Sequence, residues 1–235
     1  MTIPEKNIQM PSLGLLCGGL GKRLGSLTKQ IPKALVEING EPFIAHQLRL
    51  VSRSGVKNVV VCAGYLGEQI KTYVGSGERF NVNVSYSFDG EKLLGTGGAV
   101  KKALPLLSDP FLIMYGDSYL NADFAPIIKY FYQKGAKALV TVFRNKNQWG
   151  TSNIAWKNGV ITEYSKRSSS LQMEYIDYGL TMIRKSSFDS FSDIEAFDLD
   201  QVFIQMVHQD EMLGFEVEER FYEIGSLAGL EKVKQ

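Results

Sequence analysis

The sequence has few cysteines and histidines, and its charges nearly cancel. Of 235 residues, two are Cys and two are His, while 26 Lys and Arg oppose 25 Asp and Glu. Two cysteines in no metal-type spacing provide no disulfide scaffold, so we expect Cys17 and Cys62 to be free thiols of a reducing compartment, the cytoplasm. A net charge of +1 lacks the broad basic field of general nucleic-acid binders. We therefore expect no nucleic-acid partner, and phosphate recognition that is local.

Long hydrophobic runs are also absent. No apolar stretch approaches the roughly 20 residues that span a bilayer, and Met1 to Pro11 has no signal-peptide core. We expect a protein that is neither inserted into a membrane nor exported. A hydrophobic content of 44% and a charged content of 22% are typical of a globular chain, and the length fits a single domain, residues 1–235.

What the sequence does contain, through about residue 145, is an alternation of apolar runs and helical patterns. Strands are expected at 13–17, 58–64, 81–88, 110–118 and 137–144, with helices at 41–55, 68–75, 95–107 and 123–135. This order predicts βαβ units and an α/β fold with a doubly wound, mostly parallel mixed sheet. Such sheets bind ligands beyond the carboxyl ends of their strands.

A different pattern begins near residue 146. Two alternating runs flank Asn158-Gly159, a dipeptide that favours a tight hairpin turn. Further strands are expected at 174–185 and 213–218, around a helix at 198–209. We expect a β-rich subdomain, residues 146–235, joined without a free linker to the first half, residues 12–145.

The stretch "LCGGLGKRLGSLTKQIPKAL", Leu16 to Leu35, follows the first expected strand. Glycines let backbone N–H groups approach a phosphate closely, so Gly18, Gly19 and Gly21 predict a phosphate-binding loop. The spacing fits neither the dinucleotide fingerprint nor the Walker loop. Arg23 and Lys33 add positive charge suited to a triphosphate. The alternative is a tight strand-to-helix turn with two solvated cations.

This stretch resembles the signature loop of the sugar-1-phosphate nucleotidyltransferases, and Leu24, Thr28, Pro32 and Lys33 match its pattern. The resemblance implies a Rossmann-like nucleotidyltransferase fold. It also implies that Arg23 and Lys33 are catalytic. The nucleotide-binding residues that it implies here are Leu16, Gly18, Gly19, Gly21 and Lys22.

A second segment, "LLGTGGAV", is similar to the family's Gly-Thr segment over the nucleotide base and sugar. The resemblance implies that Gly95 and Thr96 bind nucleotide. Taken alone, Thr96 reads equally well as a helix N-cap. Glu91 lies where a base-contacting side chain is expected, which favours guanine.

Two acids are implied to share a metal ion. Asp117 in "MYGDSYL" follows an apolar strand, where a carboxylate can hold Mg²⁺. The segment "FYEIGS" resembles the family's late Asp-Ile-Gly-Thr segment, with Glu223 and Ser226 in place of Asp and Thr. The cofactor is therefore expected to be Mg²⁺ on Asp117 and Glu223, with Asp117 also catalytic. The alternatives are a turn cap for Asp117 and a surface carboxylate for Glu223.

The segment "ITEYSK" resembles the family's Glu-Lys segment, which aligns Lys166 with the lysine that meets the sugar phosphate. By the same resemblance Gly150, Tyr178 and Gly179 fall in sugar-contacting loops. Ser165 stands where the family usually has glutamate. His46 and His208 share no partner by spacing, and we expect structural roles for both.

The resemblance implies Mg-dependent in-line transfer of a nucleotidyl group from a nucleoside triphosphate to a sugar 1-phosphate, giving a nucleotide sugar and pyrophosphate. Residues 146–235 would then bind the sugar. Ser165 leaves open another phosphate or phosphonate as acceptor, including a cytidylyltransferase reaction. Glu223 leaves open a nucleotide-binding module without turnover, and homo-oligomerisation stays open too.

Overall fold

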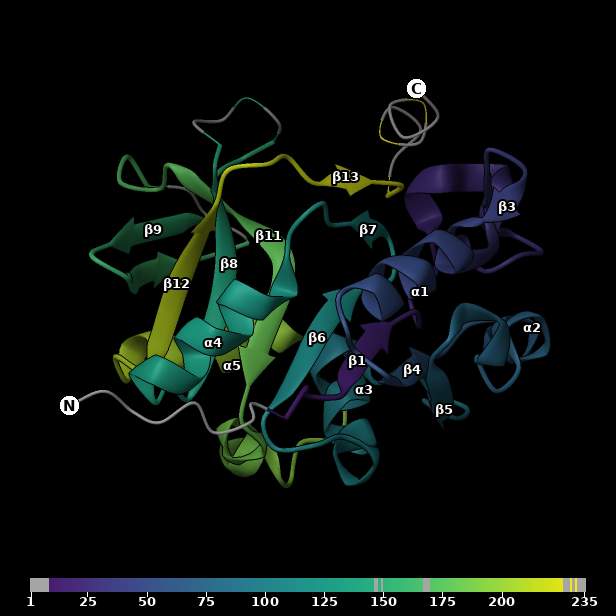
Figure 1. Ribbon diagram of the computed structural model, residues 1–235, viewed down its shortest axis with the longest axis horizontal. Helices are drawn as coiled ribbons and strands as arrows, with labels where there is room; N and C mark the ends of the chain where they lie inside the picture. The colour runs from purple at the N-terminus through teal and green to yellow at the C-terminus, as the bar shows by residue number, and fades with distance from the viewer. Residues whose placement is uncertain are drawn as a thin grey trace.

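The fold is a nine-stranded mixed sheet with helices on both faces (Figure 1). The structure is a computed structural model that describes residues 9–145, 148, 150–166, 170–225, 229 and 231, without the side chains of Lys22, Arg23 and Ser26. The strand order is β5-β4-β1-β6-β11-β8-β12-β10-β9. The bounds are β1 Leu13–Leu16, β4 Asn58–Ala63, β5 Asn83–Phe88, β6 Phe111–Tyr115, β8 Ala138–Arg144, β9 Ile154–Lys157, β10 Val160–Tyr164, β11 Tyr175–Ile183 and β12 Met212–Val217.

The first half of the chain forms the parallel part of this sheet. β1 lies between β4 and β6 and pairs with both in parallel, so that Leu15 is in register with Val61 and Met114. β5 adds to β4, also in parallel. Because these strands run the same way, their carboxyl ends meet at one edge, as the alternation of strands and helices predicts.

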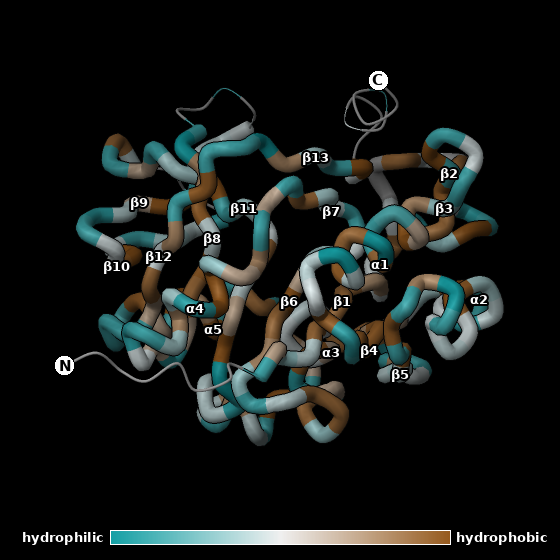
Figure 2. Tube along the Cα trace, viewed as in Figure 1, coloured by the Kyte–Doolittle hydropathy of each residue, from teal (hydrophilic) through white to brown (hydrophobic). Residues whose placement is uncertain are grey.

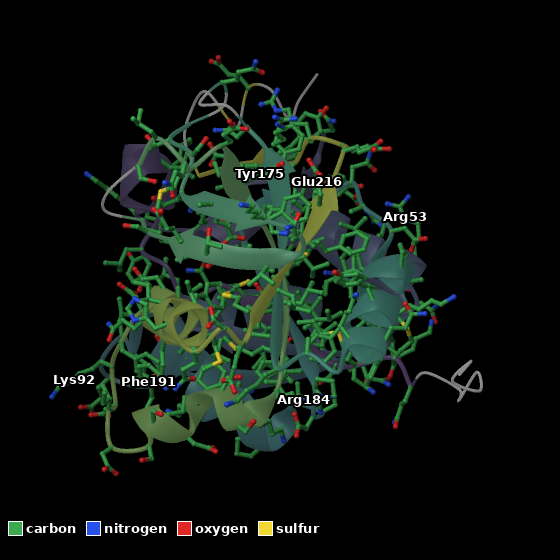
Figure 3. The ribbon with its side chains drawn as sticks, turned by 90° about the vertical axis from the view of Figure 1, so that its left-hand side faces the viewer. Arg53, Lys92, Tyr175, Arg184, Phe191 and Glu216 are labelled. Atoms are coloured by element: carbon green, nitrogen blue, oxygen red, sulfur yellow. The ribbon has the colours of Figure 1, made fainter. Side chains whose placement is uncertain are left out.

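Helices cover both faces because successive strand residues point to opposite sides. α1 (Phe43–Arg53), α2 (Gly67–Val74) and α4 (Phe124–Lys134) pack on the face that includes Leu13 and Leu15, and α3 (Gly95–Ala103) and α5 (Leu199–His208) pack on the face of Val60 and Ile113. Figure 3 shows Arg53, at the end of α1, and Lys92, in the loop before α3, on opposite sides of the molecule. Hydrophobic residues concentrate along the central strands in Figure 2.

The strands after residue 146 extend the same sheet. β11 inserts between β6 and β8 and is antiparallel to both, and Figure 3 labels Tyr175 and Arg184 at its two ends. β12 pairs in parallel with β8, and β10 and β9 follow toward the edge. The expected hairpin is confirmed, since Asn158 and Gly159 have φ of 53° and 88° between β9 and β10.

Two short ribbons lie beside the sheet. β7 (Ser118–Tyr119) pairs with β13 (Tyr222–Glu223), and β2 (Glu37–Ile38) pairs with β3 (Glu41–Pro42). Cys17 and Cys62 are buried free thiols, as expected, and burial raises the pKa of Cys62 to about 12. Within the described ranges no helix is both long enough and apolar enough to cross a membrane.

Candidate active site

A first cavity of about 400 Å³ opens at the carboxyl ends of β1 and β6. Eight of the residues predicted from the sequence lie along its wall: Leu16, Gly18, Gly19, Gly21, Lys33, Gly95, Thr96 and Asp117. Segments separated by about a hundred residues in the sequence therefore meet around one space. Its size is within the range of small-molecule sites.

The glycine-rich loop is held tightly where it leaves β1. Gly21 has a φ of 61°, and a side chain there would meet Thr28 at 2.8 Å. The Thr28 hydroxyl donates to the Gly21 carbonyl oxygen at 2.9 Å, which closes the turn. Lys22 and Arg23 begin the 3-10 helix η1 (Lys22–Thr28), but their side chains lie outside the described structure. The predicted catalytic role of Arg23 stays a prediction.

Lys33 and Asp117 form an ion pair in the first cavity. The Lys33 Nζ lies 2.5 Å from Asp117 Oδ2, and the two side chains are 15% and 29% exposed. Lys33 begins a short 3-10 helix, η2 (Lys33–Leu35), directly after Pro32, and Asp117 lies two residues beyond β6. The pair joins two of the three predicted catalytic residues.

A buried glutamine fixes the turn that carries Asp117. Gln47 on α1 is fully buried, and its Nε2 donates to the carbonyl oxygens of Tyr115 and Ser118 at 2.9 and 2.8 Å. These carbonyls lie on either side of Gly116 and Asp117. Gln47 was not predicted from the sequence, because a polar residue on the apolar face of a helix reveals its partner only when the fold is known.

Glu223 lies beside Asp117 through its backbone. In the β7–β13 ribbon Glu223 is in register with Ser118, and the Ile224 N–H donates to the Asp117 carbonyl oxygen at 2.9 Å. The Glu223 carboxylate accepts a hydrogen bond from the Gly225 N–H, and Gly225 lines the first cavity. Ser226 lies outside the described residues.

The charge of the first cavity fits a divalent cation. Three carboxylates, those of Asp89, Asp117 and Asp198, line it, and Lys33 is its only cationic side chain among those described. No cluster of three or more His, Cys, Asp or Glu that could hold an ion occurs in the described part of the chain. Mg²⁺ prefers one or two protein carboxylates together with phosphate oxygens. Of the two predicted ligands, Asp117 lines this cavity and Glu223 does not, so the shared metal site stays a prediction.

The Gly-Thr segment forms the start of α3, but Thr96 is not its N-cap. Leu94 occupies that position, and the Thr96 hydroxyl accepts a hydrogen bond from the Leu199 N–H at 2.9 Å. A side chain at Gly97 would clash with Phe197 at 2.3 Å. The glycines therefore let α3 pack closely against residues 195–198, the segment just before α5, and Asp198 of this segment lines the cavity.

Glu91 is exposed and lies outside the lining of the first cavity, whereas Asp89 is part of it. Asp89 is 8% exposed, and its Oδ2 accepts from the Leu94 N–H at 3.3 Å. Burial raises the pKa of this carboxyl. Asp89 directly follows β5, so the strand-end rule that indicates Asp117 could also have indicated Asp89.

A second cavity of about 430 Å³ adjoins the first. Lys166, predicted to meet the sugar phosphate, lines it, and so do Tyr178 and Gly179, which were predicted to fall in sugar-contacting loops. Gly150 is not in its lining, and the Gly150 carbonyl oxygen accepts from Asn145 Nδ2 at 2.8 Å. Ser165 lines the cavity beside Lys166.

The acid Asp177 also lines the second cavity and was not predicted. Its Oδ1 accepts from the Gly179 N–H at 2.9 Å, and its Oδ2 accepts from the Tyr164 hydroxyl at 3.2 Å. Burial raises the pKa of Asp177, while nearby Lys166 opposes this rise. The register of β11 against β8 shifts between Asp177 and Thr181, an irregularity that no local sequence pattern reveals.

The two predicted structural histidines lie away from both cavities. His46 on α1 approaches the Ile38 carbonyl oxygen through Nε2 at 3.0 Å, and His208 ends α5. Neither lines the first or the second cavity. These positions agree with structural roles.

A doubly wound sheet with a glycine-rich loop and an acid at neighbouring strand ends is typical of α/β proteins that bind phosphorylated ligands. A family model described as nucleotidyl transferase matches residues 15–167. The chain is 30% identical over 187 residues to D-glycero-alpha-D-manno-heptose 1-phosphate guanylyltransferase of Campylobacter jejuni, a match covering 80% of this chain and 82% of that protein.

Two further comparisons agree. The chain is 32% identical over 176 residues to a protein of Bacillus subtilis named probable glucose-1-phosphate cytidylyltransferase, covering 66% of this chain and 68% of that one. The solved structure of HddC from Yersinia pseudotuberculosis has a TM-score of 0.81 at 20% identity, covering 96% of this chain and 98% of that chain. The chain therefore belongs to the nucleotidyl transferase family and is an enzyme of that kind, and the resemblance carried by its motifs is confirmed.

Proposed function

We propose that this enzyme transfers a nucleotidyl group from a nucleoside triphosphate, preferentially GTP, to a sugar 1-phosphate, releasing pyrophosphate. The observation that carries the proposal is the contact of two cavities: one is lined by the glycine-rich loop, Lys33 and Asp117, and the other by Lys166. A triphosphate in the first and a phosphate monoester in the second would meet at their boundary. The relatives' names, a heptose 1-phosphate guanylyltransferase and a glucose-1-phosphate cytidylyltransferase, support the same reaction.

The reaction needs charge neutralisation more than proton transfer. A phosphate monoester is already anionic at neutral pH, so its oxygen can attack the α-phosphorus without a general base, in agreement with the positions of both histidines. Lys33 would hold the phosphate chain, and Arg23 is proposed to neutralise charge on the α-phosphate and leaving group. Asp117 and Glu223 would hold Mg²⁺, which supplies additional positive charge to the phosphate oxygens when bound.

The proposed preference for GTP rests on Asp89. Guanine presents an N–H and an amino group side by side, and a carboxylate can accept from both. Asp89 is a nearly buried acid in the first cavity, where such a base would relieve the cost of burying its charge. Uracil and thymine offer a single N–H that lies between two carbonyl oxygens, and the carboxylate oxygens repel these carbonyl oxygens.

The test is a substrate screen. The enzyme with Mg²⁺ is incubated with ATP, GTP, CTP or UTP and a panel of sugar 1-phosphates that includes mannose and heptose 1-phosphates, and pyrophosphate release and product mass are measured. We expect release only when a sugar 1-phosphate is present, and most release with GTP. Release with phosphocholine or a phosphonate in place of the sugar would identify another acceptor, and nucleotide binding without release would identify a non-catalytic module.

The base preference has its own test. Asp89→Asn should lower kcat/KM for GTP about tenfold or more, as expected for losing a hydrogen-bonded charge, and reduce its advantage over UTP. Glu91→Gln is the matched comparison two residues away. If Glu91→Gln abolishes the preference and Asp89→Asn does not, the sequence-based assignment to Glu91 is right and the one to Asp89 is wrong.

A further inference from the structure

One tyrosine separates the two cavities. Tyr115 is the last residue of β6 and, among the described residues, the only one that lines both the first and the second cavity. Its backbone is fixed by the hydrogen bond from Gln47 Nε2 to its carbonyl oxygen. The ring is thus set at the boundary that two phosphorylated substrates would share.

The hydroxyl of Tyr115 contacts Lys166. The Lys166 Nζ donates to this hydroxyl at 3.2 Å and lies 5.1 Å from the centre of the ring. A phenol carries its own proton at neutral pH, because tyrosine ordinarily titrates at about pH 10. It can therefore accept from the ammonium group and still offer its own O–H to an anion.

Lys166 needs such a partner. It lies on an exposed stretch just after β10, and a long lysine side chain loses considerable conformational freedom when it is held in one place. Tyr115 comes from a central strand, which is a far more rigid support. The hydrogen bond to Tyr115 therefore restricts the movement of the Lys166 side chain at the surface.

We propose that Tyr115 is a positioning residue that holds the Lys166 ammonium group at the boundary of the two cavities, where it orients the acceptor phosphate for attack. This inference rests on the proposed function and deepens it. It assigns the alignment of the acceptor phosphate to Tyr115 on β6, a strand whose carboxyl end lies at the first cavity. Alignment of this kind contributes to rate because small displacements of reacting groups are costly.

The test is a double-mutant cycle of Tyr115→Phe and Lys166→Met, with Tyr132→Phe on α4 as the control for losing a half-buried tyrosine hydroxyl. Tyr115→Phe should lower kcat/KM for the sugar 1-phosphate about tenfold or more, the effect of losing a hydrogen bond to a charged group. Binding of a non-hydrolysable GTP analogue, measured by titration, should be unchanged. In the Lys166→Met background, Tyr115→Phe should change kcat/KM less than about twofold, because the partner is already absent.

The outcomes separate the two proposals. An equal loss in both backgrounds, no loss in the single variant, or a loss of analogue binding would overturn the role of Tyr115 while leaving the reaction intact. Inorganic phosphate titrated into the nucleotide-free protein gives a readout without turnover, and both single variants should weaken its binding. If the wild-type enzyme neither binds this phosphate nor releases pyrophosphate with any sugar 1-phosphate, the proposed function itself fails, and the role of Tyr115 with it.

Discussion

Replacing Gln47 tests how the fold fixes the Asp117 turn. Gln47→Met keeps the length and volume of the side chain but removes two hydrogen bonds, at 2.9 and 2.8 Å, to the carbonyls of Tyr115 and Ser118. At about 0.5–1.5 kcal/mol for each bond, the loss is about 1–3 kcal/mol in the free energy of unfolding. For a chain of this size, each kcal/mol lowers Tm by roughly 2–4 °C. Urea unfolding and a thermal melt measure both quantities.

The same change should impair turnover more than stability. The two carbonyls flank Asp117, so without Gln47 the carboxylate loses its fixed position, and a displacement of about 1 Å can cost about 10²-fold in rate. Gln205→Met is the control, because the half-buried Gln205 donates one solvent-exposed hydrogen bond to the Ser190 hydroxyl. Wild-type Tm and wild-type pyrophosphate release in Gln47→Met would refute the claim that this glutamine sets the turn.

Three further predictions concern the charged groups. Arg23→Ala should lower kcat about 10²-fold or more with little change in Tm, because it removes one preorganised hydrogen-bond donor from the reacting phosphate. A near-normal kcat would contradict the catalytic role proposed for Arg23. Asp117→Asn should abolish the activation of pyrophosphate release by added Mg²⁺, and a retained metal response would contradict the ligand assignment. Burial raises the pKa of Asp177, so folding favours its protonated form and the wild type loses stability as pH rises through the folded pKa. Asp177→Asn should therefore have a higher free energy of unfolding than the wild type at pH 7, measured by urea unfolding, and this difference should become smaller at acidic pH. A difference that grows at acidic pH would show that the pKa of Asp177 is lowered by folding instead.

Local sequence patterns were enough for the main helices and strands and for part of the site, but they did not predict the two short ribbons β2–β3 and β7–β13. Helix α4 illustrates this, because Asp123 caps it by accepting from the Ala125 N–H and Gly135 ends it with a φ of 60°. The strand-end rule placed Asp117 at the first cavity for a physical reason, since parallel strands deliver their carboxyl ends to one edge.

Long-range pairing could not be predicted in the same way. Nothing within Tyr175–Ile183 specifies that β11 inserts between β6 and β8, because strand order depends on contacts between residues far apart in the sequence, such as Leu180 with Met114. The approach of Tyr115 to Lys166 depends on that order. Asp177 was missed for the same reason, as its place in the second cavity follows from an irregularity in strand pairing.

The turn after β6 has a consequence for how such an enzyme can diversify. Tyr115 and Asp117 are two residues apart, yet one faces both cavities and the other faces the first. A substitution of Tyr115 can therefore reach both cavities, whereas a substitution of Asp117 acts on the first cavity. Residues on β11 and just after β10 line the second cavity and not the first, so the proposed acceptor specificity can be engineered, or can evolve, from there without a change in the lining of the first cavity.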